Sequence, residues 1–475
     1  MTEHGLIARS DANLLGQGRV AAHSPDTARA GMQILQRGGN AADAAAAMTL
    51  TACVAEPLVV SLLSGMHGIV VDTAGRVTGV DAFVDIPTQI QGGRTAETAV
   101  VFADEQVPYT IGGATFGVPG LVAGCGALNR RHGRLPWAAV VAPAQAVAQT
   151  GVVMSAADAV LLQMLQRVMT LDAGHDVFCN DDGTLKVAGD RLILPGIAGV
   201  LDELATDGAQ ALYVGGLAQD LAAFCSQVGA LVDSHDLAAM HAITHTPPAV
   251  SLKAHTVRTR RGLSPLSDWI AALNARLPSE PTVVRLAAVQ QPGLPQVTGT
   301  TSLAAMDADG NACAVTASLG LGTGDWFRGS QLNSMLGETD LLTGPLRPRT
   351  RMGSMMAPTV LTDGRGVRAV LGAAGGSRIP SAMLRVIEGM VGQDLSASAA
   401  VDLPRLHRTG EVVHVEPHMP DVAVADLHAA GWQVQRWQTR HHFFGGVSMV
   451  STTDAAGDGR RDGAALGPSH PSEIV

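Results

Sequence analysis

The stretch VTGTTSLAAMDADGNACAVTASLG, residues 297–320, decides the fold. Two apolar runs, TTSLAAM and ACAVTASL, flank the short segment DADGN, and such a pattern is typical of a β-hairpin. With the turn centred on Asp309 and Gly310, the ladder places Thr300 opposite a residue within about one position of Ser318. The sequence therefore predicts two hydroxyl side chains that face each other at the open end of a hairpin.

The composition of the whole chain is that of a globular protein. Of its 475 residues, 46% are hydrophobic and 16% are charged, which is enough for a sizeable buried core. The formal net charge of -10 at pH 7 argues against nucleic acid and anionic membrane as partners, because both bind clustered positive charge. We therefore expect a small-molecule substrate and neither a nucleic-acid nor a membrane partner.

Cysteine usage and the start of the chain bear on cofactors and location. The five cysteines are odd in number and have no zinc-binding spacing. The beginning of the chain has no continuous apolar run before a small-residue cleavage site, and no apolar run is long enough to span a membrane. The sequence predicts a cytoplasmic protein with no disulfide framework, no metal and no cofactor.

Helix signals are clearest near the amino terminus. Ser24, followed by a proline and an acid, is typical of a helix start, and this helix should end at Gly38. Asn40 can cap a second, alanine-rich helix that runs towards Glu56. Strand-like sequence follows at residues 69–84, and helical patterns alternate with loops from 138 to 240.

The segment before the hairpin has a different texture. From Leu252 to Gly299 the sequence is polar and interrupted by prolines, which indicates an exposed connector. Beyond it, strand patterns dominate.

Motifs in order along most of the chain resemble the γ-glutamyltransferase family of N-terminal-nucleophile hydrolases. A Thr-Thr pair opens a hairpin with a D-x-DGN turn. The other matching segments are SPDTARAGMQILQRGGNAADAAAAM, FGVPGLVAGCGALNRRHGRLPW, LDELATDGAQALYVGGLAQDLAAF, GAAGGSRIP and GRRDGAALG. The resemblance implies an α+β fold, the four-layer αββα sandwich with the hairpin in a central sheet. Composition alone predicts only mixed α and β structure.

The resemblance also implies that the chain is a zymogen that cleaves itself between Gly299 and Thr300. The products are a 299-residue segment, 1–299, and a segment of 475 − 299 = 176 residues, 300–475, which stay associated as one catalytic domain. Thr300 attacks the Gly299 carbonyl, an N-to-O acyl shift gives an ester, and water releases the fragments. The freed α-amine, with a reference pKa of about 7.7–8.0, suits a general base.

Two further features complete the expected catalytic apparatus. Ser318 aligns with a family threonine whose hydroxyl contacts the nucleophile. Gly375 and Gly376 belong to a GGSR motif before a helix that opens near Pro380, where backbone N–H groups can stabilise an oxyanion. Simpler interpretations remain open: a β-branched pair that starts a strand, a serine exposed by a one-residue register shift, and a glycine turn that reverses the chain.

The substrate-binding positions depart from the family pattern. Phe83 stands where an arginine grips the α-carboxylate of a γ-glutamyl group, and an aromatic ring cannot make that bidentate contact. Arg347, Arg349 and Arg351, in a shortened loop that follows Asp340, either replace it from another direction or are solvated loop charges. Burying a carboxylate without a cation costs several kcal/mol, which argues against glutathione as substrate.

Other family groups in the pocket are partly lost. Glycine replaces an asparagine, the Asn-Gln pair is lost, the second acid is kept, and the paired serines become a serine and a methionine. These positions are Gly320, then Ser334 and Met335, then Glu338, and finally Ser354 and Met355. The resemblance makes Phe83, Gly320, Glu338, Ser354 and Met355 substrate-binding residues of a less polar pocket.

The leading hypothesis is an autoprocessing amidohydrolase or acyltransferase that acts on a small amide such as oxamate, or on an acyl amide. One alternative is a true γ-glutamyl hydrolase or transpeptidase with relocated carboxylate binding. Another is an unprocessed, non-catalytic homologue. His441 and His442 have no partner at metal-binding spacing. The sequence leaves open whether the protein forms a homo-oligomer.

Overall fold

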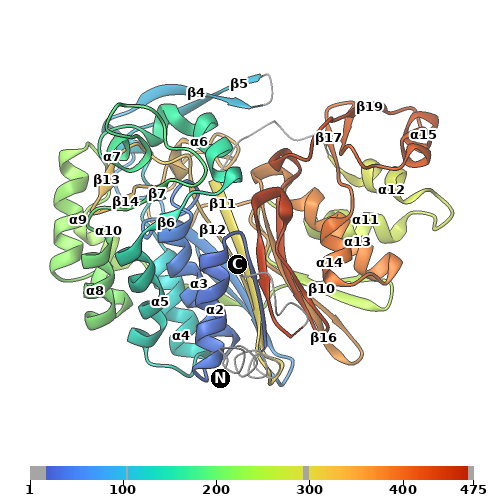
Figure 1. The fold of residues 1–475 in the computed structure, drawn as a ribbon, viewed down its shortest axis with the longest axis horizontal. Helices are drawn as coiled ribbons and strands as arrows, with labels where there is room; N and C mark the ends of the chain where they lie inside the picture. The colour runs from blue at the N-terminus through green and yellow to red at the C-terminus, as the bar shows by residue number, and fades with distance from the viewer. Residues whose placement is uncertain (1–17, 103–104, 292–298, 469–475) are drawn as a thin grey trace, which may run out of the picture.

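The computed structural model describes residues 18–102, 105–291 and 299–468. Two β-sheets pack face to face, and helices cover the outer side of each, so the molecule has four layers (Figure 1). The α+β class predicted from the sequence is therefore confirmed.

The larger sheet has seven strands in the order β22-β1-β11-β12-β2-β3-β8. The hairpin β11–β12 lies at its centre. In that order the strands are Ala464–Leu466, Arg19–Ala22, Gly299–Met306, Ala312–Gly320, Gly65–Val71, Val77–Ala82 and Ile243–His245.

The second sheet has six strands in the order β21-β20-β16-β15-β10-β9. These are Ala455–Ala456, Gly446–Ser451, Gly366–Ala374, Thr359–Asp363, His255–Thr259 and Ala249–Leu252. Small peripheral sheets are formed by β4 (Ala96–Phe102), β5 (Glu105–Ile111), β6 (Val152–Val153), β7 (Arg191–Leu192), β13 (Trp326–Phe327), β14 (Ser330–Gln331), β17 (Leu406–Thr409), β18 (Val412–Val415) and β19 (Gln433–Arg436).

Helices α2 (Pro25–Gln36), α3 (Ala41–Ala55) and α4 (Leu121–His132) cover the larger sheet. Helices α11 (Leu266–Ala275), α13 (Ile379–Gln393) and α14 (Ala397–Asp402) cover the smaller one. The remaining helices are α5 (Trp137–Thr150), α6 (Ala156–Met169), α7 (Gly174–Phe178), α8 (Ile197–Asp207), α9 (Gly216–Gln227), α10 (Ser234–Ala239), α12 (Thr282–Val289) and α15 (Asp421–Ala429).

The predicted caps of the first two helices are confirmed. The Ser24 hydroxyl accepts a hydrogen bond from the Asp26 N–H at 3.2 Å. Helix α2 ends at Gln36, two residues before Gly38. Asn40 forms a reciprocal capping box with Asp43 at the start of α3. Helix α3 is buried along its whole length and packs on β11 and β12, which explains its alanine-rich sequence.

The hairpin also forms in the predicted register. Thr300 pairs with Ser318, and Gly310 in the turn has φ +94, a left-handed conformation that glycine adopts without strain. The two sheets approach so closely that a Cβ at Gly372 of β16 would lie 2.4 Å from the Ser302 hydroxyl of β11. Small side chains in the sheet interface therefore bring the hairpin against the second sheet.

The prediction of an exposed connector from Leu252 to Gly299 is wrong for residues 252–289. This segment contains β10, α11 and α12, and it buries Val257, Trp269 and Leu286 in the core beneath the smaller sheet. The prolines mark helix starts rather than an extended linker, since Pro265 and Pro281 are N-caps of α11 and α12. The last part, residues 292–298, lies outside the described residues.

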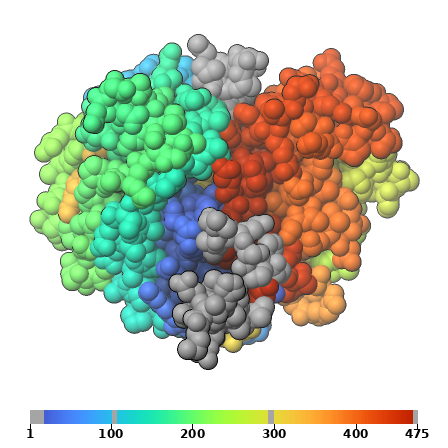
Figure 2. Space-filling view, in the orientation of Figure 1, coloured from blue at the N-terminus to red at the C-terminus, as the bar shows by residue number. Residues whose placement is uncertain are grey.

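Both segments that flank the predicted cleavage site contribute to both sheets. Segment 1–299 supplies β1, β2, β3 and β8 to the larger sheet and β9 and β10 to the smaller. Segment 300–475 supplies most of β11 together with β12 and β22, and then β15, β16, β20 and β21. In the space-filling view the green residues of the first segment and the orange and red residues of the second lie on opposite sides of one body (Figure 2).

Candidate active site

Thr300 lies at the end of the hairpin that is distant from the turn. It is the second residue of β11, and the ladder register shifts between Gly299 and Thr300. Thr300 is buried, with only 2% of its surface exposed. Such an irregularity interrupts regular ladder pairing, so the peptide bond between these two residues lies where the backbone departs from the regular sheet.

Ser318 contacts the carbonyl on the other side of that bond. Its hydroxyl donates a hydrogen bond to the Gly299 carbonyl oxygen and accepts one from the Gly320 N–H at 3.1 Å. The sequence led us to expect a contact with the Thr300 hydroxyl instead. In the uncleaved chain the buried Gly299 carbonyl needs a donor, and the Ser318 hydroxyl supplies it.

A small pocket, which we call the front pocket, opens beside these residues. Its cavity measures about 30 Å³, room for little more than one or two water-sized groups. The lining residues are Phe83, Thr300, Ser318, Gly320, Met335, Glu338, Asp340, Leu341, Ser354, Met355, Met356, Gly376 and Ile379. The structure thus brings together at one pocket all five predicted substrate-binding residues, with Thr300 and Ser318.

Phe83 fills the place where the resemblance puts an arginine. It is 1% exposed, and its ring stacks on His67 with centroids 5.3 Å apart. A Cβ at Gly65 would lie 2.6 Å from the Phe83 ring, so the glycine makes room for the aromatic group. This wall of the front pocket is apolar and tightly packed.

Glu338 supplies a carboxyl group inside the same pocket. It is 1% exposed, and its Oε1 accepts a hydrogen bond from the Leu321 N–H at 3.2 Å. Oε2 has no hydrogen-bond partner in the described part of the chain. Burial raises the pKa of Glu338 well above its usual range, so this group favours its neutral, proton-bearing form.

Gly320 and Glu338 depend on one another. Gly320 has φ +71, and a Cβ there would lie 2.7 Å from Glu338 Oε1 and 2.8 Å from the Ser334 hydroxyl. The asparagine expected from the resemblance would clash with both groups in this arrangement. The departures at Gly320 and Ser334, which look independent in the sequence, therefore belong to one packing arrangement around the retained acid Glu338.

Comparison with known proteins now identifies the family. A family model described as gamma-glutamyltranspeptidase matches residues 27–276 and 269–467. The chain belongs to the gamma-glutamyltranspeptidase family. It is an N-terminal-nucleophile enzyme of γ-glutamyltransferase type, a hydrolase or transferase that acts on amide bonds.

Individual relatives are distant but match over most of their length. Glutathione hydrolase 5 proenzyme of Mus musculus is 26% identical over 94% of this chain and 92% of its own. Acylase ACY 1 proenzyme of Pseudomonas sp. (strain SE83) is 26% identical over 88% of each chain. The crystal structure of cephalosporin acylase from Bacillus halodurans shares the fold, with a TM-score of 0.81 over 95% of this chain and 96% of its own at 22% identity.

The family's glycine pair lies between β16 and α13, as predicted. Gly376 lines the front pocket, whereas Gly375 does not, and a Cβ at Gly375 would lie 2.9 Å from the Gly445 Cα. Gly375 has φ +132 and Gly376 has φ +57. The pair thus makes a tight turn against Gly445 and presents the backbone of Gly376 to the pocket.

The arginines of the shortened loop do not replace the family arginine in this structure. Arg347 and Arg349 are exposed, and Arg349 Nε donates to the Thr88 hydroxyl at 3.0 Å. Arg351 forms ion pairs with Asp81 and Asp85 beneath the pocket wall. Arg351 is therefore neutralised by acids that the sequence interpretation had not assigned to it.

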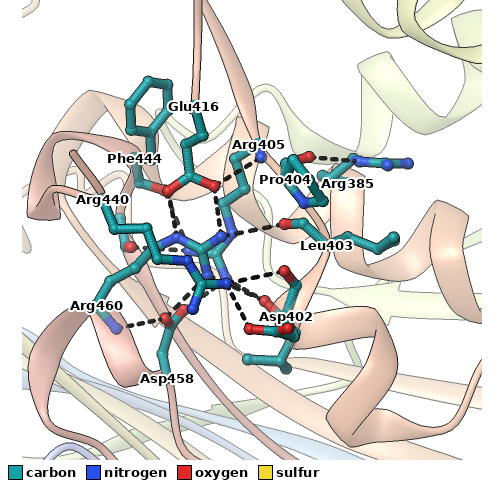
Figure 3. A network of polar contacts seen from close by, with 12 residues as sticks. Arg385, Asp402, Leu403, Pro404, Arg405, Glu416, Arg440, Phe444, Asp458 and Arg460 are labelled. Atoms are coloured by element: carbon teal, nitrogen blue, oxygen red, sulfur yellow. Dashed lines mark hydrogen bonds and ion pairs between the residues drawn. The ribbon is translucent and has the colours of Figure 1, made fainter. Parts of the chain in front are cut away.

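The family's carboxyl-terminal GRRDG motif is held by a buried ion network (Figure 3). Arg405 and Arg460 both pair with Asp458, and Arg460 Nε also donates to Glu416 at 2.6 Å. The network fixes the short helix η6 (Gly459–Arg461). Arg461, at the end of η6, donates from its guanidinium to the Thr300 carbonyl oxygen at 3.3 Å.

The rings of His441 and His442 lie close together. The His441 Nδ1 accepts a hydrogen bond from the Phe443 N–H at 3.0 Å, and the two rings of His441 and His442 lie 4.5 Å apart. Within residues 18–102, 105–291 and 299–468, no three His, Cys, Asp or Glu side chains are grouped so as to hold a metal ion. Over the same residues, no helix combines the length and apolarity needed to cross a bilayer.

Sequence reasoning missed part of the surroundings of Thr300. Glu56, interpreted only as the end of a helix, accepts a hydrogen bond from the Thr301 hydroxyl. The Arg461 contact with the Thr300 carbonyl was also missed, although the GRRDG motif was noted. Both contacts join residues more than 150 positions apart or on separate elements, so local pattern carries no signal for them.

Proposed function

We propose that this chain is an autoprocessing amidohydrolase or acyltransferase that cleaves the Gly299–Thr300 bond and then uses N-terminal Thr300 as its nucleophile. The observation that carries the proposal is the hydrogen bond from the Ser318 hydroxyl to the Gly299 carbonyl. A donor in that position polarises the carbonyl that the adjacent threonine would attack. The names of the relatives, which are proenzymes, support the same conclusion.

Cleavage begins when the Thr300 Oγ attacks the Gly299 carbonyl carbon and gives up its proton. As the carbon–nitrogen bond breaks, the nitrogen takes up a proton and becomes the free α-amine of Thr300. Segment 1–299 is then held as an ester, and water hydrolyses it to a Gly299 carboxylate and the Thr300 hydroxyl. The two segments remain together because each supplies strands to both sheets.

Turnover uses the same hydroxyl and the new amine. The α-amine, with a reference pKa of about 7.7–8.0, takes the hydroxyl proton as Thr300 attacks the substrate carbonyl and then passes it to the leaving nitrogen. Backbone N–H groups of the Gly375–Gly376 turn, of which Gly376 lines the front pocket and Gly375 lies next to it in the chain, stabilise the oxyanion before the amino terminus of α13. Water releases the acyl group in hydrolysis, and an amine releases it in transfer.

The front pocket supports a small and largely apolar acyl group. Phe83, Met335 and Met356 form apolar walls around a cavity of about 30 Å³. Glu338, kept neutral by burial, can donate one hydrogen bond to an acyl oxygen. Of the two substrates suggested by the sequence, a small amide such as oxamate or an acyl amide, these apolar walls favour a short acyl amide, and the acylase among the relatives supports this choice. The carboxylate of oxamate would be left unpaired in the same way as that of a γ-glutamyl group.

A γ-glutamyl substrate is the alternative that the glutathione hydrolases among the relatives suggest. Its α-carboxylate would meet Phe83, while the cations behind that ring, Arg260 and Arg351, are occupied by Asp81. Leaving a buried carboxylate unpaired costs several kcal/mol. The other alternative, an unprocessed homologue without activity, predicts a single uncleaved chain on a denaturing gel.

The test combines that gel with an amide panel. The purified protein should separate into fragments of 299 and 176 residues, and Thr300→Ala should remain a single chain without activity. Oxamate, acetyl and butyryl anilides, and γ-glutamyl anilide are then compared at equal concentration. A single wild-type chain, with amidase activity that survives Thr300→Ala, contradicts the proposal, and preferred turnover of γ-glutamyl anilide selects the alternative.

A further inference from the structure

A second cavity lies behind the strand that carries Thr300. We call it the back cavity; its polar lining residues are His23, Glu56, Asp158, His442 and Arg461. Successive side chains of a strand point to opposite faces, so the back cavity faces Thr301 while the front pocket faces Thr300. The proposed reaction gives no role to this group of ionisable side chains.

Glu56 is attached directly to the residue after the nucleophile. Its Oε2 accepts a hydrogen bond from the Thr301 hydroxyl, and its Oε1 accepts one from the Thr27 hydroxyl at 2.7 Å. Glu56 is the C-cap of α3 and is 5% exposed. Two hydroxyls from separate elements therefore hold the carboxyl group in one orientation.

Arg461 holds the same stretch of backbone. Its guanidinium donates to the Thr300 carbonyl oxygen at 3.3 Å, while its Nε has no hydrogen-bond partner among residues that the structure describes. Two hydrogen bonds thus hold the peptide unit between Thr300 and Thr301: Arg461 binds its carbonyl oxygen, and Glu56 binds the Thr301 hydroxyl. Both Arg461 and Glu56 line the back cavity.

Glu56 is an acid of this cavity that titrates near neutral pH, and burial also raises the pKa of the neighbouring Asp158. Burial raises the pKa of Glu56 to about 7, although the hydrogen bonds from Thr301 and Thr27 work against the rise. Burial, with Arg461 second, lowers the pKa values of His23 and His442 to about 3, so both rings are neutral. The groups that face Glu56 from neighbouring elements are His23 before α2, Asp158 of α6, Arg461 of η6 and His442 of η5 (His442–Phe444).

We propose that Glu56 is a positioning residue, which acts on Thr300 through the Thr301 hydroxyl. The charge state of Glu56 is coupled to that of the Thr300 α-amine. This inference rests on the proposed role of Thr300. Ionised Glu56 places a negative charge beside the residue that follows the amine, which favours the ammonium form. Protonated Glu56 removes that charge and leaves more of the amine free to act as base.

The coupling has a signature in the titration of the amine. Because Glu56 and the amine ionise in the same pH range, the wild-type amine should titrate over a broader range than one independent group. In Glu56→Gln the carboxylate is absent at every pH. The amine should then titrate as a single group, with its midpoint lower by about 0.5–1 pH unit.

The experiment needs no knowledge of the substrate. Competitive labelling of the processed protein with acetic anhydride across pH 5–9, followed by mass spectrometry of the amino-terminal peptide of the second fragment, reports the titration of the Thr300 amine. Glu388→Gln is the matched control, because Glu388 is also 5% exposed but contacts Arg385 and Gln393 on α13. A Glu56→Gln midpoint equal to that of wild type overturns the inference.

Thr301 variants test the connection independently, in case Glu56→Gln fails to fold. Thr301→Val keeps the shape but loses the hydroxyl, and we expect kcat to fall about tenfold with KM nearly unchanged. Thr301→Ser should restore it, with the anilide most rapidly hydrolysed by wild type as probe. Equal kcat in all three proteins overturns the inference even when wild type is processed, whereas an unprocessed wild-type chain overturns the proposed function itself.

Discussion

The two sides of strand β11 differ in the chemistry of their surroundings. The front pocket is mainly apolar and contains Glu338, a buried carboxyl group whose Oε2 has no partner among the described residues. The back cavity is lined mainly by ionisable side chains, and Arg461 reaches it from η6, which the Asp458 network anchors. One strand therefore separates the groups that select an acyl group from the groups that hold the nucleophile, and substitutions on the two sides should have separable effects.

The largest effect is expected behind the strand. Asp458→Asn removes a charge that pairs with Arg405 and Arg460, both of which stay buried. Breaking a buried ion pair from one side costs about 3–5 kcal/mol of unfolding free energy. Urea denaturation measures it, and Asp421→Asn, which disrupts an exposed pair with Arg436, should cost about 1 kcal/mol or less.

The contribution of Asp458 to stability should also depend on pH, in a direction set by its pKa. Burial opposes the ionisation of Asp458, but Arg405 and Arg460 outweigh it and hold the pKa of this carboxyl well below its usual range. The group therefore stabilises the fold above its unfolded pKa of about 3.9, and that contribution is lost as pH falls towards the folded pKa. Equal stability of Asp458→Asn and wild type at pH 7 would show that the network does not support η6.

The next effect concerns the bond between Gly299 and Thr300. Ser318→Ala removes the donor to the Gly299 carbonyl, and loss of one such donor slows comparable reactions by about 10²–10³-fold. Precursor cleavage, followed on denaturing gels, should slow by this factor. Ser318→Thr keeps the hydroxyl and should restore most of the rate, whereas rapid cleavage of Ser318→Ala would assign the polarising role to another group.

A smaller effect is expected on the selection of substrates. Phe83→Leu removes part of the apolar wall, so longer acyl anilides should gain on acetyl anilide by about tenfold in relative kcat/KM, the value of roughly one methylene group. Phe178→Leu is a matched control, since Phe178 is equally buried but packs on Trp326. An unchanged order of preference would mean that Phe83 does not limit the acyl group.

Local patterns predicted the elements that depend on local physics. Ser24 and Asn40 cap helices because their side chains reach N–H groups within three residues, and the Asp309–Gly310 turn fixes the register of Thr300 with Ser318. The segment from Leu252 was predicted wrongly because its prolines and its basic residues at 258–261 are typical of an exposed linker, although its share of apolar residues is ordinary. Those apolar residues are buried nonetheless, as Trp269 shows.

The site divides along the same line. The front-pocket residues were found through motif positions, and all five predicted substrate-binding residues line one cavity. Contacts made by tertiary packing were not found: Glu56 with Thr301, Arg351 with Asp81, and Ser318 with Gly299 rather than with Thr300. Each depends on how separate elements pack, which a single sequence does not encode locally.

The last prediction concerns Glu338 in the front pocket. Replacing this acid should change how the stability of the fold depends on pH, rather than remove a stabilising interaction. Burial raises the pKa of Glu338, so between its unfolded pKa of about 4.3 and the folded value the native state holds the extra proton. Stability from this group is complete at low pH and is lost as pH rises. Glu338→Gln removes that dependence, so urea midpoints of variant and wild type should be similar near pH 4.5 and should diverge in favour of the variant by pH 8. Parallel curves would mean that Glu338 ionises freely, and the front pocket would then carry a charge suited to an amine rather than to an acyl oxygen.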